Sequence, residues 1–213
     1  MACEPPPAPA GPVLGLLSRG LEVWLRQQCE GIEELEIQLQ GSAAALLQGR
    51  LAGARLAAAG VRYERLLIER VRLQSDPLQV RMGRLLRQRT LELEQPFLIR
   101  GRVAFSGEGL TQALRDARWR ELGVSLAERL LGTEDLGTVV LAEDHLVLAP
   151  ATTDGSAGPG RGARIEAAPA GLVLHPLDGG PTATIPLDDD MQIERAWVEN
   201  GSLLLEGAAR VRP

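Results

Sequence analysis

The chain has 213 residues, of which 45% are hydrophobic and 24% charged, and its formal net charge is −5. These values are typical of a globular protein with one large or two small domains, and they exclude a disordered chain, a collagen, a disulfide-rich miniprotein and a multi-span membrane protein. All 23 basic residues are arginine, which excludes lysine-dependent chemistry such as Schiff-base formation or a P-loop phosphate site.

Charge is distributed unevenly along the chain. Residues 61–120 carry a net charge of +6, whereas residues 121–213 carry −9. This asymmetry predicts either a basic face for anionic partners or an attraction between the basic and the acidic half of the chain. The alternative is that the charges are scattered over the surface and solvated. Cys3 and Cys29 do not make a secreted disulfide framework, so a reducing compartment is expected.

Residues 1–12 are predicted to form a Pro-rich, disordered leader. Residues 13–213 are predicted to form a single α+β domain. Residues 13–28 have helical spacing, and their apolar face is expected to cover the protein's own sheet or to lie on a membrane surface. No export signal is evident, and the segment is too short to span a bilayer. We therefore expect a cytoplasmic protein or one that is peripheral at the membrane.

Strands are predicted after Gly31, where the apolar period changes from helical to alternating. They cover residues 34–40, 50–60 and 70–74, and the clearest pattern runs over residues 90–105. One parity of that segment is apolar and the other is mainly charged, so one face is expected to be buried. Because the segment is longer than a typical strand, bends or bulges are expected at Pro96 and Gly101.

Two short helices and a β-meander complete the predicted fold. Ser106 is a favourable N-cap for a helix over residues 107–117, and a second helix is expected over residues 125–131, ending at Gly132. An antiparallel meander is predicted over residues 136–210. Its strands are expected over residues 139–148, 165–174, 191–199 and 203–210, with a type I′ turn at Asn200-Gly201.

No catalytic constellation is evident in the sequence. Neither His145 nor His175 has a nucleophile near it in the sequence, and no nucleophile-elbow, metalloprotease or Walker motif occurs. The acidic triplet 188–190 is interpreted as a solvated turn rather than a metal site. We therefore expect no enzyme activity, no cofactor and no bound metal.

An arginine cluster within residues 81–89 is the densest basic segment. It has no interleaved aromatic residues for base stacking, and the whole chain is acidic, so nucleic acid is not expected as a partner. The cluster is better suited to a few phosphate groups, and a solvated helix or loop face is the alternative.

Residues 46–131 resemble the LmeA-like phospholipid-binding family, including its cyanobacterial members. The likeness lies in the order of several segments: Gln48–Gly53, Gly60–Leu66, Val71–Leu78, Leu91–Pro96, Gly101–Phe105 and Ser106–Leu114. The resemblance implies an α+β fold in which helices cover a long curved antiparallel sheet, similar to tubular lipid-binding proteins. It also implies phospholipid binding, and it carries over no catalytic residue.

These observations predict a noncatalytic phospholipid-binding or lipid-carrier protein. An apolar groove for acyl chains is expected from Leu91, Leu93, Phe97, Ile99, Val103 and Phe105, covered by a helix that contributes Leu17, Leu21 and Trp24. The lipid phosphate is expected near Arg81, Arg84 and Arg87, which favours anionic phospholipid or an anionic membrane surface. The alternatives are a structural or interaction module with a fully packed core, and an enzyme of lipid or glycan metabolism.

Overall fold

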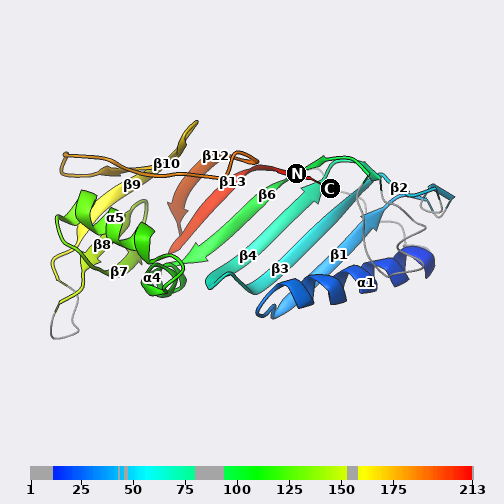
Figure 1. Cartoon of the computed structure of the whole chain (residues 1–213), viewed down its shortest axis with the longest axis horizontal. Coiled ribbons are helices and arrows are strands. Elements are labelled where there is room, and N and C mark those ends of the chain that lie inside the picture. The colour runs from blue at the N-terminus through cyan, green and yellow to red at the C-terminus, as the bar shows by residue number, and fades with distance from the viewer. Residues whose placement is uncertain (1–11, 43, 46–47, 80–93, 153–157, 213) are drawn as a thin grey trace.

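The larger layer of the protein is a six-stranded antiparallel sheet with the order β1-β3-β4-β6-β13-β12 (Figure 1). The computed structural model describes residues 12–42, 44–45, 48–79, 94–152 and 158–212. The strands of this sheet are β1 (Glu34–Gln40), β3 (Gly53–Tyr63), β4 (Leu66–Ser75), β6 (Phe97–Ser106), β12 (Met191–Glu199) and β13 (Ser202–Val211). The sheet curls into a half-barrel.

A second antiparallel sheet of five strands packs at one end of the first and has the order β11-β10-β9-β8-β7. Its strands are β7 (Leu136–Leu141), β8 (Leu146–Pro150), β9 (Arg161–Ala168), β10 (Gly171–Pro176) and β11 (Ala183–Ile185). Contacts between β9 and β12 join the two sheets. A small ribbon pairs β2 (Arg50–Leu51) with β5 (Leu78–Gln79).

Helices cover one face of the large sheet near its two ends (Figure 1). Helix α1 (Pro12–Gln28) lies on β1, whereas α4 (Gly107–Arg115) contacts β4, β6 and β7, and α5 (Arg120–Leu131) contacts the second sheet. Ser106 caps α4, since its Oγ accepts a hydrogen bond from the Gly109 amide at 3.1 Å. Gly132 ends α5 with a φ of 68°. The predicted α+β class, with a curved antiparallel sheet covered by helices, is confirmed.

The main hydrophobic core lies between α5, the second sheet and the adjoining end of the large sheet, and Leu130 and Leu148 are its largest fully buried side chains. A separate cluster forms under α1, where Leu21 and Leu25 pack against a group that includes Ile37. Helix α1 therefore covers the protein's own sheet. Its outer side exposes Val23 and Trp24.

Two predicted strands of the meander are hairpins in the structure. Residues 139–148 belong to β7 and β8, because the Ala142 amide donates to the His145 carbonyl at 2.9 Å and closes a polar turn. Residues 165–174 similarly divide into β9 and β10. The turn at Asn200-Gly201 is confirmed, with φ angles of 52° and 73° at its two residues.

The alternative of a bulge at Gly101 is wrong, since β6 pairs with β13 from Phe97 to Ser106 without a register shift. Glycine is needed there because the strands approach closely: a Cβ at this position would lie 2.0 Å from the Arg72 carbonyl oxygen. Pro96 stands directly before β6, in keeping with its lack of a donor for the ladder.

Arg161 of β9 connects three parts of the smaller layer. Its guanidinium donates to the Asp178 carboxylate at 2.8 Å, to the Leu130 carbonyl at the end of α5 at 2.6 Å, and to the Gly179 carbonyl at 2.5 Å. The Arg161 side chain is only 26% exposed, so these bonds are partly shielded from water. They fix the last turn of α5 against the β10–β11 connection.

We expect Arg161→Leu to lower the free energy of unfolding by about 2–3 kcal/mol, because it removes charge-assisted bonds and leaves the Leu130 carbonyl without its donor. Urea denaturation followed by circular dichroism measures the change. Arg164→Leu is the matched control on the same strand, since the Arg164 side chain is 66% exposed and its ion pair is with an exposed aspartate. Equal effects of the two variants would contradict the expectation.

The difference between wild type and Arg161→Leu is also expected to depend on pH. The hydrogen bond from Arg161 lowers the pKa of Asp178 below its ordinary value. A carboxyl group whose pKa is lower in the folded than in the unfolded state stabilises the protein at pH values above the pKa of the unfolded state. This contribution is lost as the pH falls through the pKa of the folded state. The stability difference should therefore be constant near neutral pH and shrink below about pH 4.

Candidate functional site

The two faces of the six-stranded sheet differ sharply in chemistry. On the face that carries α1 and α4, cross-strand pairing aligns apolar residues in rows, one of which is Leu35, Ala58, Val71, Val103 and Leu205. On the opposite face, β4 presents Arg70, Arg72 and Gln74, and β6 presents Arg100 and Arg102 between Leu98 and Ala104. This arrangement follows from strand geometry, because successive side chains point to opposite sides of a sheet.

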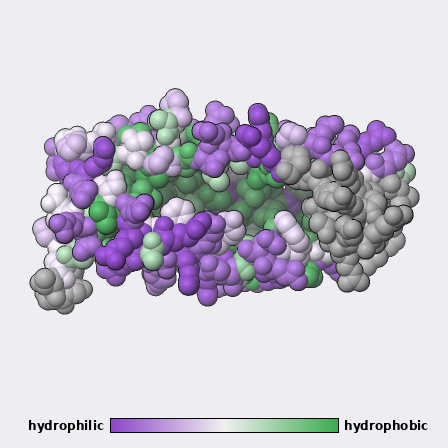
Figure 2. Space-filling view, viewed as in Figure 1, coloured by the Kyte–Doolittle hydropathy of each residue, from purple (hydrophilic) through white to green (hydrophobic). Residues whose placement is uncertain are grey.

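The apolar face is hollowed along its middle. Figure 2 shows hydrophobic side chains gathered in a depression over β4, β6 and β13, with hydrophilic side chains along its rims. We call this depression the apolar trough and define it by four partly exposed side chains that these strands present on this face: Leu73, Ile99, Val103 and Leu205. Its floor includes the cross-strand pair Gly101 and Gly207, where no side chain rises from the sheet.

The predicted groove residues of β6 share the face of the trough but differ in their surroundings. Phe105 is 7% exposed and belongs to the main core, and Val103 also packs against that core. Ile99 and Phe97 lie toward the other end of the strand and belong to none of the hydrophobic clusters found among the described residues. Among the described residues, the row therefore packs into the main core at its end near the second sheet and not at its beginning.

The other predicted site residues are distributed as follows. Leu21 packs under α1 against β1, and Trp24 is 43% exposed on the outer side of that helix. The Leu17 side chain and residues Leu91 and Leu93 lie outside the described residues. The predicted phosphate ligands Arg81, Arg84 and Arg87 also lie outside them.

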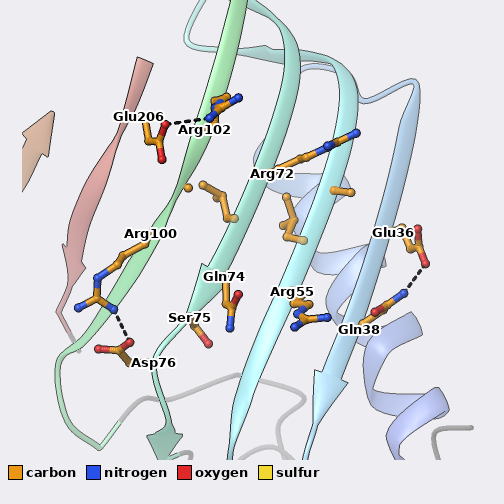
Figure 3. A pocket seen from close by; sticks show the side chains of 14 residues that line it. Glu36, Gln38, Arg55, Arg72, Gln74, Ser75, Asp76, Arg100, Arg102 and Glu206 are labelled. Carbon is orange, nitrogen blue, oxygen red and sulfur yellow. Dashed lines mark hydrogen bonds and ion pairs between the residues drawn. The ribbon is translucent and has the colours of Figure 1, made fainter. Parts of the chain in front are cut away.

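The polar face carries a pocket that sequence reasoning did not identify. It has a volume of about 710 Å³ and is lined by four arginines and by acidic and amide side chains (Figure 3). We call it the arginine pocket and define it by Arg55, Arg72, Arg100 and Arg102. The alternation of arginine with other residues in β4 and in β6 was visible in the sequence. The pairing of these two strands in the sheet was not.

Comparison with known families identifies the chain over almost its whole length. The model of the family described as LmeA-like phospholipid-binding matches residues 10–208. The chain belongs to this family. The match extends well beyond residues 46–131, on which the sequence resemblance rested, and includes both sheets.

Membership in the LmeA-like family indicates phospholipid as the ligand class, and the family is not a known class of enzymes. No significant match was found among curated proteins or among solved structures. In the described part of the chain, no helix has the length and hydropathy of a membrane span.

Proposed function

We propose that the protein binds phospholipid noncatalytically and holds the acyl chains in the apolar trough. The single observation that carries the proposal is this trough, an apolar hollow between flanking helices, in a member of a phospholipid-binding family. A trough of partly exposed leucine, isoleucine and valine side chains gains stability when hydrocarbon replaces the water above it. Each buried methylene group contributes about 0.8 kcal/mol.

The dimensions of the sheet fit an acyl chain. Strands β4 and β6 have ten residues each, and at about 3.3 Å per residue a strand of this length spans about 33 Å. One leaflet of a bilayer has a hydrocarbon depth of about 15 Å, so a strand of this length exceeds the extension of a chain in a membrane. The face is therefore long enough for acyl chains to lie along the strands or across them.

The polar end of the lipid is part of the same proposal. Arginine forks bind phosphate oxygens in pairs, which favours anionic phospholipid or an anionic membrane surface. Arg81, Arg84 and Arg87 remain the residues predicted for this role from the sequence. The proposal for the acyl chains does not depend on them.

Native mass spectrometry of the full chain after detergent-free purification tests the proposal. We expect a species heavier than the chain by the mass of one or more phospholipids, and organic extraction should release the same lipids. A chain that carries no lipid and takes none up from anionic vesicles would contradict lipid binding. That outcome would favour an interaction module with a filled core.

A further inference from the structure

The arginine pocket lies on the face of the large sheet opposite the apolar trough, so lipid held in the trough cannot reach it through the sheet. In Figure 3, α1 is seen behind the strands and the pocket side chains stand in front of them. A smaller hollow of about 250 Å³ is lined by two of the same arginines, Arg72 and Arg102. These two side chains therefore line both depressions on the polar face.

Strand register brings like charges together in the pocket. Arg72 of β4 is directly opposite Arg102 of β6, and the neighbour of Arg72 on its other side, Ala57 of β3, is uncharged. Like charges directly opposite each other in a sheet are destabilising. The pair therefore concentrates positive charge on one place of the polar face.

Two acidic residues of the pocket pair with Arg100 and Arg102, whereas none of the described ion pairs involves Arg72. Arg100 pairs with Asp76 at 2.5 Å, and Arg102 pairs with Glu206 at 2.9 Å. Arg102 also lies 5.0 Å from the ring centre of Trp197, which adds a second contact that holds it.

The remaining acid, Glu36, accepts a hydrogen bond from Gln38 at 2.8 Å. Arg72 is exposed and forms no hydrogen bond or ion pair with any residue that the structure describes. Figure 3 shows it extended across β3, whereas Arg100 and Arg102 turn toward their acidic partners. The four arginines and three acids that line the pocket leave it with a formal charge of +1.

We propose that the arginine pocket binds a phosphate group, with Arg72 as the principal ligand and Arg102 beside it. Directly opposite residues of an antiparallel pair have Cβ atoms about 4.5–5.5 Å apart, so their guanidinium groups can converge on one tetrahedral anion. Each guanidinium offers a planar pair of donors to phosphate oxygens. Binding removes the repulsion between the two arginines and supplies the counter-charge that Arg72 lacks.

The pocket favours one phosphate group over an extended polyanion. Its described lining contains no aromatic side chain on which a base can stack, and its formal charge matches a single anion. Its volume lies within the range of about 300–1,000 Å³ found for small-molecule sites. The phosphate belongs either to a soluble phosphate ester or to a phospholipid headgroup at a membrane surface, and the experiment separates these sources.

The test uses the full chain and Arg72→Gln, with Arg164→Gln as the control of equal charge change on the second sheet. Inorganic phosphate is titrated at constant ionic strength while the arginine Nε–Hε signals are followed by NMR. Flotation with vesicles of phosphatidylglycerol and phosphatidylcholine, against phosphatidylcholine alone, forms the second arm. We expect Arg72→Gln to weaken binding about tenfold or more and Arg164→Gln less than about twofold.

The outcomes are distinguishable. Saturable phosphate binding that Arg72→Gln weakens supports a soluble ligand, whereas an effect confined to phosphatidylglycerol vesicles supports a headgroup. Absence of binding in both arms overturns the inference, and so does an Arg72→Gln effect no larger than that of Arg164→Gln. Lipid that co-purifies with Arg72→Gln is measured in parallel by native mass spectrometry. If the protein retains lipid but binds no phosphate, only this inference is overturned. If the protein carries no lipid but binds phosphate, only the proposed function is overturned.

Discussion

Ile99→Glu is expected to reduce the phospholipid that co-purifies with the protein about tenfold or more. Ile99 lies on the trough face of β6, with Ser75 and Ala209 as its cross-strand neighbours. A carboxylate at this position would have to lose its hydration when an acyl chain lies over it. Desolvation of an unpaired charge costs several times the roughly 1.4 kcal/mol that corresponds to a tenfold loss of affinity.

The effect of Ile99→Glu on stability is expected to be small, because the side chain is partly exposed and belongs to none of the buried clusters among the described residues. Val140→Glu on β7 is the matched control, since Val140 is 55% exposed on a strand of the other sheet. Native mass spectrometry compares bound lipid, and urea denaturation compares stability. Lipid retained at the wild-type level by a folded Ile99→Glu protein would show that acyl chains do not occupy this part of the sheet.

Local sequence signals predicted the elements whose causes are local. Ser106 was predicted to cap α4 and does so through its own hydroxyl, and Asn200-Gly201 forms the turn that its tolerance of positive φ indicates. The alternation in β6 correctly separated an apolar from a charged face. In each case the determining interactions lie within a few residues or follow from the two-residue period of a strand.

Features set by distant residues could not be predicted in the same way. Helix α5 begins at Arg120, before the expected start at residue 125, and the preceding Trp119 is held by a hydrogen bond from its indole to the Glu64 carbonyl at 2.8 Å. The arginine pocket depends on the register that places Arg72 opposite Arg102. A single sequence shows which residues share a face of a strand, but not which residues face each other across two strands.

Gly101→Ala is expected to lower the free energy of unfolding by about 3 kcal/mol or more, or to prevent folding, which would rank it with the most severe single substitutions. An added Cβ would lie 2.0 Å from the Arg72 carbonyl oxygen and 2.9 Å from the Leu73 Cα. Both contacts are with backbone, so no side-chain rotation relieves them, and β4 must move away from β6. Urea denaturation followed by tryptophan fluorescence measures the loss.

Gly20→Ala is the control, because it makes the same glycine-to-alanine change elsewhere in the chain. Its expected effect on the free energy of unfolding has the opposite sign. Gly20 lies within α1 and a Cβ there meets nothing within 4 Å, so the change should stabilise the protein by about 0.5–1 kcal/mol through helix propensity. The closeness of β4 and β6 at Gly101 matters to both faces, because the same pairing aligns Leu73 in the trough and Arg72 in the arginine pocket. Any soluble Gly101→Ala protein should therefore lose lipid and phosphate binding together, and a variant of wild-type stability that keeps both would contradict this view of the sheet.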